Sequence, residues 1–440
     1  MARPDLVVRS RRTVTPDGIR PAAIQVTDGR IRAIEDYSAG GDADREVDIG
    51  DLALLPGLVD THVHVNEPGR TDWEGFTTAT QAALAGGITT IVDMPLNSLP
   101  PTVSVAALRE KQSAAEGQCW VDVAFWGGAV PGNEGEFAGL HEAGVVGFKC
   151  FLLDSGNQEF PPLDEAGLRS AMAVLAGLDA TMIVHAEDAA EISSVSSRDF
   201  GAFVASRPPK AERRAIEKVV AAAAGTGARA HIVHLSAAEC VAMIAGAQGA
   251  GIRLSAETCP HYLVFATEQV PEGATEFKCC PPIRDGHNRE ALWRGLEAGV
   301  IDCVVSDHSP CPPAMKSPDT GDFGTAWGGI SSLQLGLSAV WTVAQRRGRT
   351  LDEVARWMAA RPAALAGLTA KGRLAPGCDA DLVAFDPDEA FTVDAAGLRH
   401  RHAMTPYNGQ KLTGQVKRVW LRGKEISADG PPEGRLLARG

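Results

Sequence analysis

The chain has 440 residues, 45% hydrophobic and 22% charged, a balance that excludes an intrinsically disordered protein. Its formal net charge of −13 opposes binding to the phosphate backbone of nucleic acid. Because no run of 18 apolar residues occurs and the N-terminal segment lacks the apolar region of a signal peptide, we expect a soluble cytoplasmic protein without a membrane partner. The nine scattered cysteines fit a reducing compartment.

Both ends of the chain have the texture of a small β-sheet. Short β-like runs separated by turn signals cover residues 5–10, 22–26 and 31–35, and again residues 381–386, 391–393 and 416–422. We therefore predict one composite sheet domain built from both termini, residues 1–54 and 372–440, which flank a different domain over residues 55–371.

Between these ends, runs of β character alternate with alanine-rich amphipathic stretches. The eight runs cover residues 57–65, 89–94, 121–126, 145–151, 181–185, 230–235, 253–257 and 301–307. Eight such units match the size of a closed (β/α)₈ TIM barrel, which belongs to the α/β class. A doubly wound open sheet is the second interpretation.

The first β/α unit carries boundary signals for its helix. Thr71 and Glu74 have the spacing of a capping box at the start, and Gly86-Gly87 is typical of a left-handed stop at the end. Residues 188–214 are longer than a usual connection, so we interpret them as an inserted segment near the barrel mouth.

Histidine and carboxylate side chains follow the predicted strands at the end where barrel enzymes place their chemistry. His62 and His64 end the first run, and their spacing puts both imidazoles on one strand face. His185, His234 and Asp307 end the fifth, sixth and eighth runs. Imidazole and carboxylate suit zinc or a neighbouring divalent ion, and this many ligands exceed the needs of one catalytic site. Two metal ions are therefore predicted.

Other chemically capable residues receive weaker assignments from sequence alone. His231 and His308 neighbour predicted ligands at an odd or opposite-face spacing, so we assign them no ligand role. For Lys149, within the fourth run, a salt bridge is the default interpretation. The Cys279-Cys280 pair has no second pair to complete a soft-metal site, so it favours packing or substrate-loop structure.

Several segments together resemble the metal-dependent cyclic amidohydrolases. They comprise residues 56–70, 73–75, 93–98, 144–151, 185, 234, 280–285, 306–316, 326–330, 371–377 and 407–409. The resemblance covers the chain from about residue 5 to about residue 425. It implies a TIM barrel with a β-sandwich formed by the two termini, and assembly as a homotetramer.

The resemblance also implies a set of metal ligands. His62, His64 and Asp307 would hold one ion, while His185 and His234 would hold the other. Lys149, carboxylated on its side-chain nitrogen to give N6-carboxylysine, would bridge the two ions. Zinc is the expected metal, with cobalt, manganese or iron as alternatives.

The activity implied is hydrolysis of a cyclic amide by a hydroxide shared between the two ions, with Asp307 moving a proton to the leaving nitrogen. Dihydroorotase-like members carry an arginine where this chain has Asn66, although Arg70 could reach the site. A small-molecule substrate without a carboxylate is therefore favoured, and a hydantoin ring bearing a ureido group fits. The predicted substrate contacts are Asn97, Ser309, Cys280 and Gly328.

Two alternative functions stay open at this point. Hydantoinases and dihydropyrimidinases have the same chemistry and different ring loops, so relative turnover of their substrates separates them from this interpretation. A non-catalytic scaffold like the dihydropyrimidinase-related proteins would keep the barrel and lose metal ligands. Because all six ligand positions are present, the sequence favours an enzyme.

Overall fold

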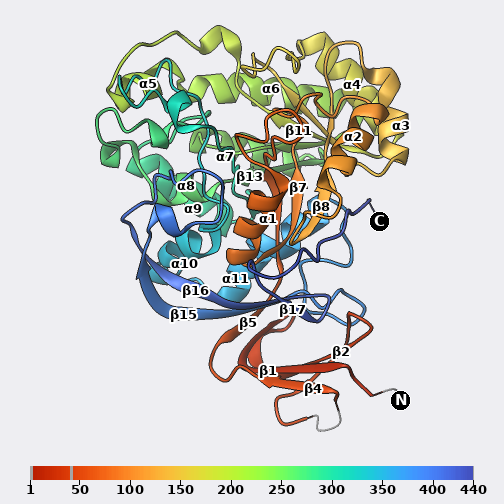
Figure 1. The fold of residues 1–440 in the computed structure, drawn as a ribbon. Coiled ribbons are helices and arrows are strands. Elements are labelled where there is room, and N and C mark those ends of the chain that lie inside the picture. Colours follow the sequence, from red (N-terminus) through yellow and green to blue (C-terminus); the bar gives the residue numbers. More distant parts are fainter. Residues whose placement is uncertain (1–2, 40–42, 440) are drawn as a thin grey trace.

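The computed structural model describes residues 3–39 and 43–439. Residues 1–2, 40–42 and 440 fall inside the predicted terminal segments and lie outside the described residues. Figure 1 shows helices packed around a group of strands in one part of the molecule and a separate sheet below them, with the N-terminus at the far end of that sheet.

The separate sheet is built from both ends of the chain, as predicted. In the described part of the chain its strand order is β17-β16-β15-β5-β1-β2-β3, and β4 pairs with β1. The strands are β1 (Leu6–Thr15), β2 (Gly18–Thr27), β3 (Arg30–Asp36), β4 (Arg45–Asp48), β5 (Ala53–Pro56), β15 (Leu382–Thr392), β16 (Lys411–Leu421) and β17 (Lys424–Ile426). The N- and C-terminal halves join where β15 pairs antiparallel with β5, and Val383 lies opposite Leu55.

The other strands form the predicted barrel. All eight runs contain a strand, and the short strand β9 follows directly after the third run. The strands are β6 (Leu58–Val63), β7 (Ile88–Asp93), β8 (Asp122–Phe125), β9 (Gly127–Gly128), β10 (Phe148–Phe151), β11 (Thr181–His185), β12 (Arg229–Ile232), β13 (Leu254–Thr258) and β14 (Cys303–Val304).

Backbone hydrogen bonds close the ring of parallel strands. They run in the orders β6-β7-β8 and β9-β10-β11-β12-β13-β14. The two groups meet where Val146 N donates to Phe125 O (3.0 Å) and where His64 N donates to His308 O (2.9 Å). Closure brings the carboxyl ends of all these strands to one rim, which is where TIM-barrel enzymes carry their active sites.

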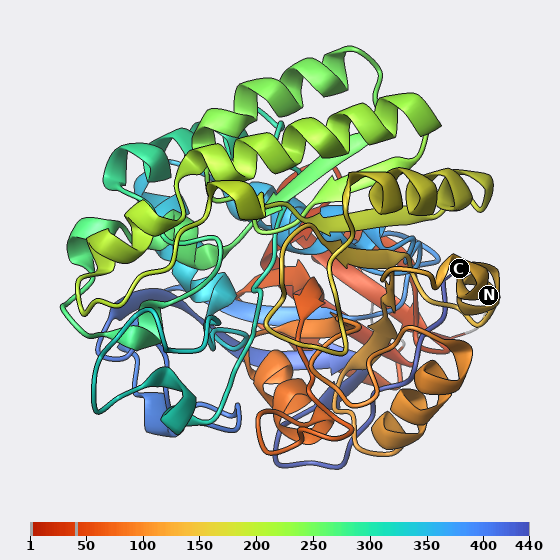
Figure 2. The same ribbon diagram turned by 90° about the horizontal axis from the view of Figure 1, so that it is seen from above.

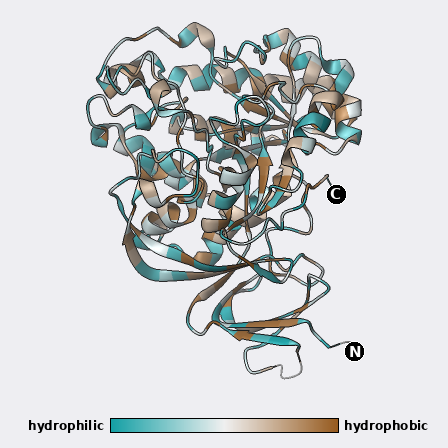
Figure 3. Cartoon of the chain, viewed as in Figure 1, coloured by the Kyte–Doolittle hydropathy of each residue, from teal (hydrophilic) through white to brown (hydrophobic). Residues whose placement is uncertain are grey.

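Helices surround the strands, as the view from above shows (Figure 2). The α-helices are α1 (Phe76–Ala85), α2 (Val105–Ala115), α3 (Phe137–Glu142), α4 (Glu165–Gly177), α5 (Phe200–Ser206), α6 (Pro209–Thr226), α7 (Val241–Gly249), α8 (Pro260–Val264), α9 (Gly286–Glu297), α10 (Gly336–Arg346), α11 (Leu351–Ala355) and α12 (Arg361–Leu365). In Figure 3 the strands inside the helices carry many hydrophobic residues, and hydrophilic residues lie on several outward helix faces. No helix in the described ranges has both the length and the apolar character needed to cross a membrane.

The start of α1 differs from the predicted capping box, so that prediction is wrong. The N-cap is Gly75, whose position supplies no side-chain cap, and Glu67 Oε2 accepts a hydrogen bond from Phe76 N (3.0 Å) instead. Glu74 is fully buried and its Oε2 atom contacts His308 Nε2 (3.2 Å), so this carboxylate is used by the barrel interior. The predicted left-handed stop is confirmed at Gly87, which has φ +78°.

A buried ion cluster joins the sheet to the barrel. Lys371 Nζ lies 2.6 Å from Asp122 Oδ2, 2.7 Å from Asp381 Oδ2 and 2.9 Å from Asp379 Oδ2, and Arg422 also pairs with Asp122. The three carboxylates are close enough to hold a metal ion, but the ammonium of Lys371 already occupies the space between them. The cluster therefore acts as a structural connection between the two parts.

Candidate metal centre and active site

The ten residues that the sequence predicts for the site line one cavity of about 280 Å³. They are His62, His64, Asn97, Lys149, His185, His234, Cys280, Asp307, Ser309 and Gly328. The histidines lie at or just beyond the carboxyl ends of their strands and Lys149 lies within β10, so barrel closure brings residues far apart in sequence to one cavity.

The tightest group of potential ligands consists of His62, His64 and Asp307. Asp307 Oδ1 lies 3.2 Å from His62 Nε2 and 3.4 Å from His64 Nε2. One ligand atom from each of the three residues lies within 4.8 Å of the others, and all three side chains are buried. Two imidazole nitrogens and a carboxylate oxygen therefore converge on one point.

A second group of donors lies beside the first. The rings of His185 and His234 have centroids 4.5 Å apart, and the ring of His234 lies 5.3 Å from that of His62. The Nδ1 atom of His234 is buried without a hydrogen-bond partner. Lys149 is 1% exposed, and its amine lies 4.9 Å from the centre of the Phe151 ring but forms no hydrogen bond or ion pair within the described residues. A buried amine and a buried imidazole nitrogen without partners are costly unless a ligand completes them.

Three predicted site residues have left-handed backbone conformations. The φ angles are +73° at Asn97, +39° at His234 and +45° at Asp307. Side chains other than glycine rarely adopt this region, and such conformations tend to occur at functional sites where the surrounding fold imposes them. The surrounding fold therefore holds the backbone at these three residues in a strained conformation, which sets the direction of their side chains.

Buried carboxylates fix the orientation of one histidine in each group. Glu257 Oε1 contacts His62 Nδ1 (2.5 Å), and Glu257 Oε2 contacts His231 Nε2 (3.0 Å). Glu187 Oε2 contacts His185 Nε2 (2.9 Å). Each contact leaves the opposite ring nitrogen of the histidine for a ligand, as carboxylate partners do in many metal sites. Sequence analysis missed Glu257, although it ends a predicted strand.

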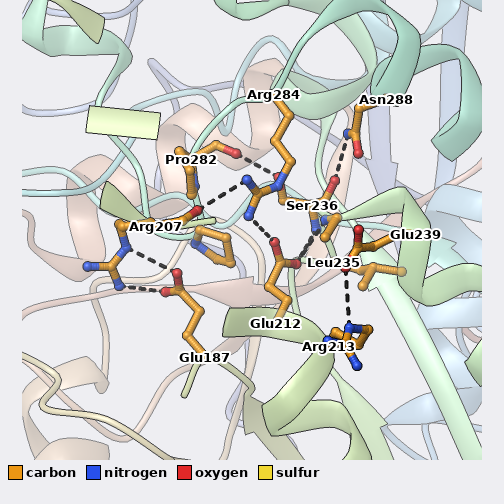
Figure 4. Close-up of polar contacts among 12 residues, drawn as sticks. Glu187, Arg207, Glu212, Arg213, Leu235, Ser236, Glu239, Pro282, Arg284 and Asn288 are labelled. Carbon is orange, nitrogen blue, oxygen red and sulfur yellow. Dashed lines mark hydrogen bonds and ion pairs between the residues drawn. The ribbon is translucent and has the colours of Figure 1, made fainter. Parts of the chain in front are cut away.

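Ion pairs and hydrogen bonds connect Glu187 to Arg207 and onward to Arg284 and Glu212, as Figure 4 shows. Arg207 donates to both carboxylate oxygens of Glu187, with N–O distances of 3.0 and 2.6 Å. Arg284 donates to Arg207 O (3.1 Å) and to Glu212 Oε1 (2.7 Å). The second oxygen of Glu212 accepts from Ser236 N (2.9 Å), just beyond His234. These contacts tie α6 to the loops that carry the second group of donors.

Burial and neighbouring charges set the ionisation of the donors. Burial lowers the pKa of His64 to about 4, and it also lowers the pKa values of His185 and His234. Burial lowers the pKa of Lys149 to about 8. Burial acts to raise the pKa of Asp307, but the adjacent imidazoles outweigh it and hold this pKa well below its usual range. Neutral imidazoles and an ionised carboxylate are the forms that bind metal ions.

The outer wall of the cavity contains residues that sequence analysis did not predict. Arg207, Lys278 and Trp327 line it, and Trp327 packs edge-on against Trp73 with 5.0 Å between ring centroids. Phe151 also lines the cavity, but its ring stacks on that of His185 with 4.6 Å between centroids. Arg70 does not line the cavity, because it donates to Asn97 O (3.0 Å). The expectation that Arg70 could reach the site is therefore wrong in this structure.

Comparison with known proteins places this site in a family. The profile described as the amidohydrolase family matches residues 53–426. The chain belongs to the amidohydrolase family. Its region of match contains the whole barrel and all ten predicted site residues.

Individual amidohydrolase relatives agree with that assignment. A protein of Streptomyces avermitilis named allantoinase is 53% identical, with 100% of each chain covered. The protein of the same name from Saccharomyces cerevisiae is 46% identical over 86% of this chain and 83% of its own length. The solved structure of L-hydantoinase (dihydropyrimidinase) from Arthrobacter aurescens has a TM-score of 0.94 at 32% identity and covers 99% of this chain and 100% of that chain.

The donor chemistry of this amidohydrolase site fits divalent metal ions. Nitrogen and carboxylate oxygen donors dominate it, and this mixture suits zinc and its first-row neighbours better than calcium or magnesium. The unpartnered Nδ1 atom of His234 and the unpaired amine of Lys149 support the same fit. In the neighbouring group His231, Glu257 and Cys303, the two oxygens of Glu257 already contact His231 and His62, so this carboxylate supports His62.

Proposed function

We propose that this amidohydrolase is an allantoinase, which opens the hydantoin ring of allantoin by hydrolysis to give allantoate in purine catabolism. The observation that carries the proposal is the convergence of all six predicted ligand positions on one cavity, in a chain 53% identical over its whole length to a protein named allantoinase. Residues 64–70, 73–75 and 93–98 also resemble the corresponding motifs of allantoinases in particular. A non-catalytic scaffold is disfavoured because no ligand position is lost.

Two divalent ions, most simply zinc, are part of this proposal. His62, His64 and Asp307 would hold one ion, and His185 and His234 would hold the other. Lys149 would be carboxylated to N6-carboxylysine and contribute to both, which its burial and its unpaired amine support. When bound, such ions lower the pKa of water and polarise a carbonyl group.

The chain's own residues would move the proton and place the ring. Asp307 is ionised at neutral pH, so its carboxylate can accept a proton and later donate it to the leaving ring nitrogen. Asn97 and Ser309, with backbone groups of Cys280 and Gly328, lie in the same cavity and would bind the ring. The sulfur of Cys280 would lie only 3.3 Å from a Cβ atom added at Gly328, so a larger residue there would narrow the cavity.

The cavity favours a ring without a carboxylate. Asn66 is fully buried and donates only a long hydrogen bond to Pro310 O (3.5 Å), while Arg70 is held outside the cavity. Neither residue offers the bidentate clamp that a carboxylate needs. This supports allantoin, whose hydantoin ring bears a neutral ureido group, over carboxylated cyclic amides.

Removal and return of metal tests the proposal directly. We expect the chelator-treated protein to be inactive and to recover allantoin hydrolysis when zinc, cobalt or manganese is added in bicarbonate buffer, because bicarbonate supplies carbon dioxide to Lys149. Chromatography of allantoate measures the rate, and dihydrouracil and hydantoin serve as comparison substrates. Preferential turnover of either comparison substrate would assign the chain to the hydantoinase and dihydropyrimidinase alternative. Absence of bound divalent ion after reconstitution would favour the scaffold.

The Glu257→Gln variant tests how His62 is held. Glutamine keeps the shape of the side chain but loses the negative charge beside His62 Nδ1, so metal affinity or turnover should fall about 10- to 100-fold. Competition with a chelator measures the affinity, and thermal unfolding checks that the barrel remains folded. An affinity and a rate both equal to those of the unaltered protein would show that Glu257 has no such role.

Location and assembly are the remaining parts of the proposal. All nine cysteines are free, which fits the reducing cytoplasm predicted from the sequence. Assembly as a homotetramer rests on the family resemblance, and sedimentation of the purified protein measures it.

A further inference from the structure

Lys278 is a buried lysine in the outer wall of the cavity. It follows the short 3₁₀ turn Thr275–Phe277, lines the cavity and is only 7% exposed. Its Nζ atom donates to the carbonyl oxygens of Gly324 (3.3 Å) and Ala326 (2.5 Å) and lies 5.2 Å from the centre of the Phe203 ring. No carboxylate pairs with this ammonium in the part of the chain that the structure describes.

The hydrogen bonds of Lys278 leave one donor free. An ammonium group has three N–H donors, and the two backbone carbonyls satisfy two of them. A buried cation without a counter-ion is costly unless its remaining donors also find partners. Because Lys278 lines the cavity, a bound substrate can supply the third acceptor.

The position of Lys278 indicates which part of a substrate it meets. Its neighbours are Phe203 on α5, in the inserted segment, and the 324–326 segment of the wall, and within the described residues it contacts none of the strand-end histidines. The reacting carbonyl must lie beside those histidines and Asp307. Lys278 therefore faces a group attached to the ring and not the bond that is cleaved.

We propose that Lys278 is a specificity-determining residue that donates a hydrogen bond to the ureido carbonyl of allantoin. The inference rests on the proposed function and names the recognition of the ring substituent. A neutral acceptor suits the site because the carbonyl dipoles of Gly324 and Ala326 already stabilise the positive charge. The exposed carboxylate of Asp154 lines the same cavity and would repel an anionic substituent.

Lys316 provides a matched control within the same wall. It is 3% exposed, and its Nζ atom donates to the carbonyl oxygens of Lys278 (3.3 Å) and Gly329 (2.5 Å), but it does not line the cavity. Both lysines therefore hold backbone carbonyls of the wall, and only Lys278 can also contact a substrate. Loss of Lys316 removes a wall contact and no substrate donor.

The test compares Lys278→Met and Lys316→Met with three ligands that share the hydantoin ring. Allantoin carries the ureido group, hydantoin carries no substituent, and hydantoin-5-acetate carries a carboxylate. We measure KM and kcat for allantoin and the inhibition constants of the other two against it. In Lys278→Met we expect kcat/KM for allantoin to fall at least about tenfold while the inhibition constant of hydantoin changes less than about threefold. In Lys316→Met, kcat/KM for allantoin and the affinity for hydantoin should change by similar factors.

Several outcomes would overturn the inference. Equal weakening of allantoin and hydantoin in Lys278→Met would make the lysine a wall contact only, and selective weakening of hydantoin-5-acetate would make it an anion site. If Lys278→Met does not fold, as judged by thermal unfolding, Lys278→Gln allows the same comparison, because its amide has two N–H donors for the wall carbonyls and no third donor for a substrate. Absence of allantoin hydrolysis by the unaltered, metal-loaded protein is a different result, because it contradicts the proposed function itself.

Discussion

Replacement of Lys149 by alanine is expected to abolish allantoin hydrolysis. Loss of residues that only orient metal ligands costs about 10- to 100-fold, so loss of a group that both ions would share under the proposed function should cost more than about 100-fold. The amine is buried at 1% exposure in the cavity that His185 and His234 also line. Among the described residues Lys278 is the other lysine of the lining, and its contacts are with Gly324, Ala326 and Phe203. Turnover and bound metal per chain are measured together.

Added acetate or propionate should restore part of this activity. Truncation to alanine leaves space where the lysine stood, and a short carboxylate can occupy that space as the missing anion. Lys149→Met is the matched control, because it also lacks the amine but fills the space, so the same carboxylates should not rescue it. Full activity of untreated Lys149→Ala would contradict the bridging role of Lys149. Equal rescue of both variants would show that the added carboxylate does not act in the space that the lysine side chain leaves.

Local sequence signals are sufficient for the strands and for the histidines and aspartate at their ends. His62 and His64 are two residues apart on one strand, and His185, His234 and Asp307 end recognisable β-like runs, so barrel closure alone brings them together. The structure confirms the eight runs and the composite sheet. The role of Lys149 is different, because nothing in its spacing distinguishes a carboxylated lysine from one in a salt bridge.

The supporting and wall residues depend on contacts that no local pattern encodes. Arg207 reaches Glu187 from an insertion between β11 and α6, and Lys278 meets the 324–326 segment across more than 40 residues of chain. The predicted capping box at the start of α1 fails for the same reason. Glu74 has the spacing of a capping residue, but burial next to His308 uses its carboxylate in the interior.

Replacement of Asp307 by asparagine is expected to leave the fold intact and remove turnover. Asparagine has nearly the same shape, and its oxygen can still face His62 Nε2 and His64 Nε2, which lie 3.2 and 3.4 Å from Asp307 Oδ1. The amide cannot accept and return a proton near neutral pH, so general base and acid catalysis, which contributes about 10²- to 10⁴-fold, is lost. Allantoin turnover, bound metal and the unfolding temperature are measured on the same preparation.

The combination of these readings separates proton transfer from metal binding at Asp307. If the variant keeps most of its metal and its unfolding temperature but loses turnover, the carboxylate acts on the proton. If metal is lost in parallel with activity, its first role is as a ligand, and Asp307→Glu, which restores a carboxylate at a longer reach, should recover metal before it recovers rate. A rate barely below that of the unaltered protein would exclude Asp307 as the proton shuttle, because the asparagine in its place cannot accept and return a proton.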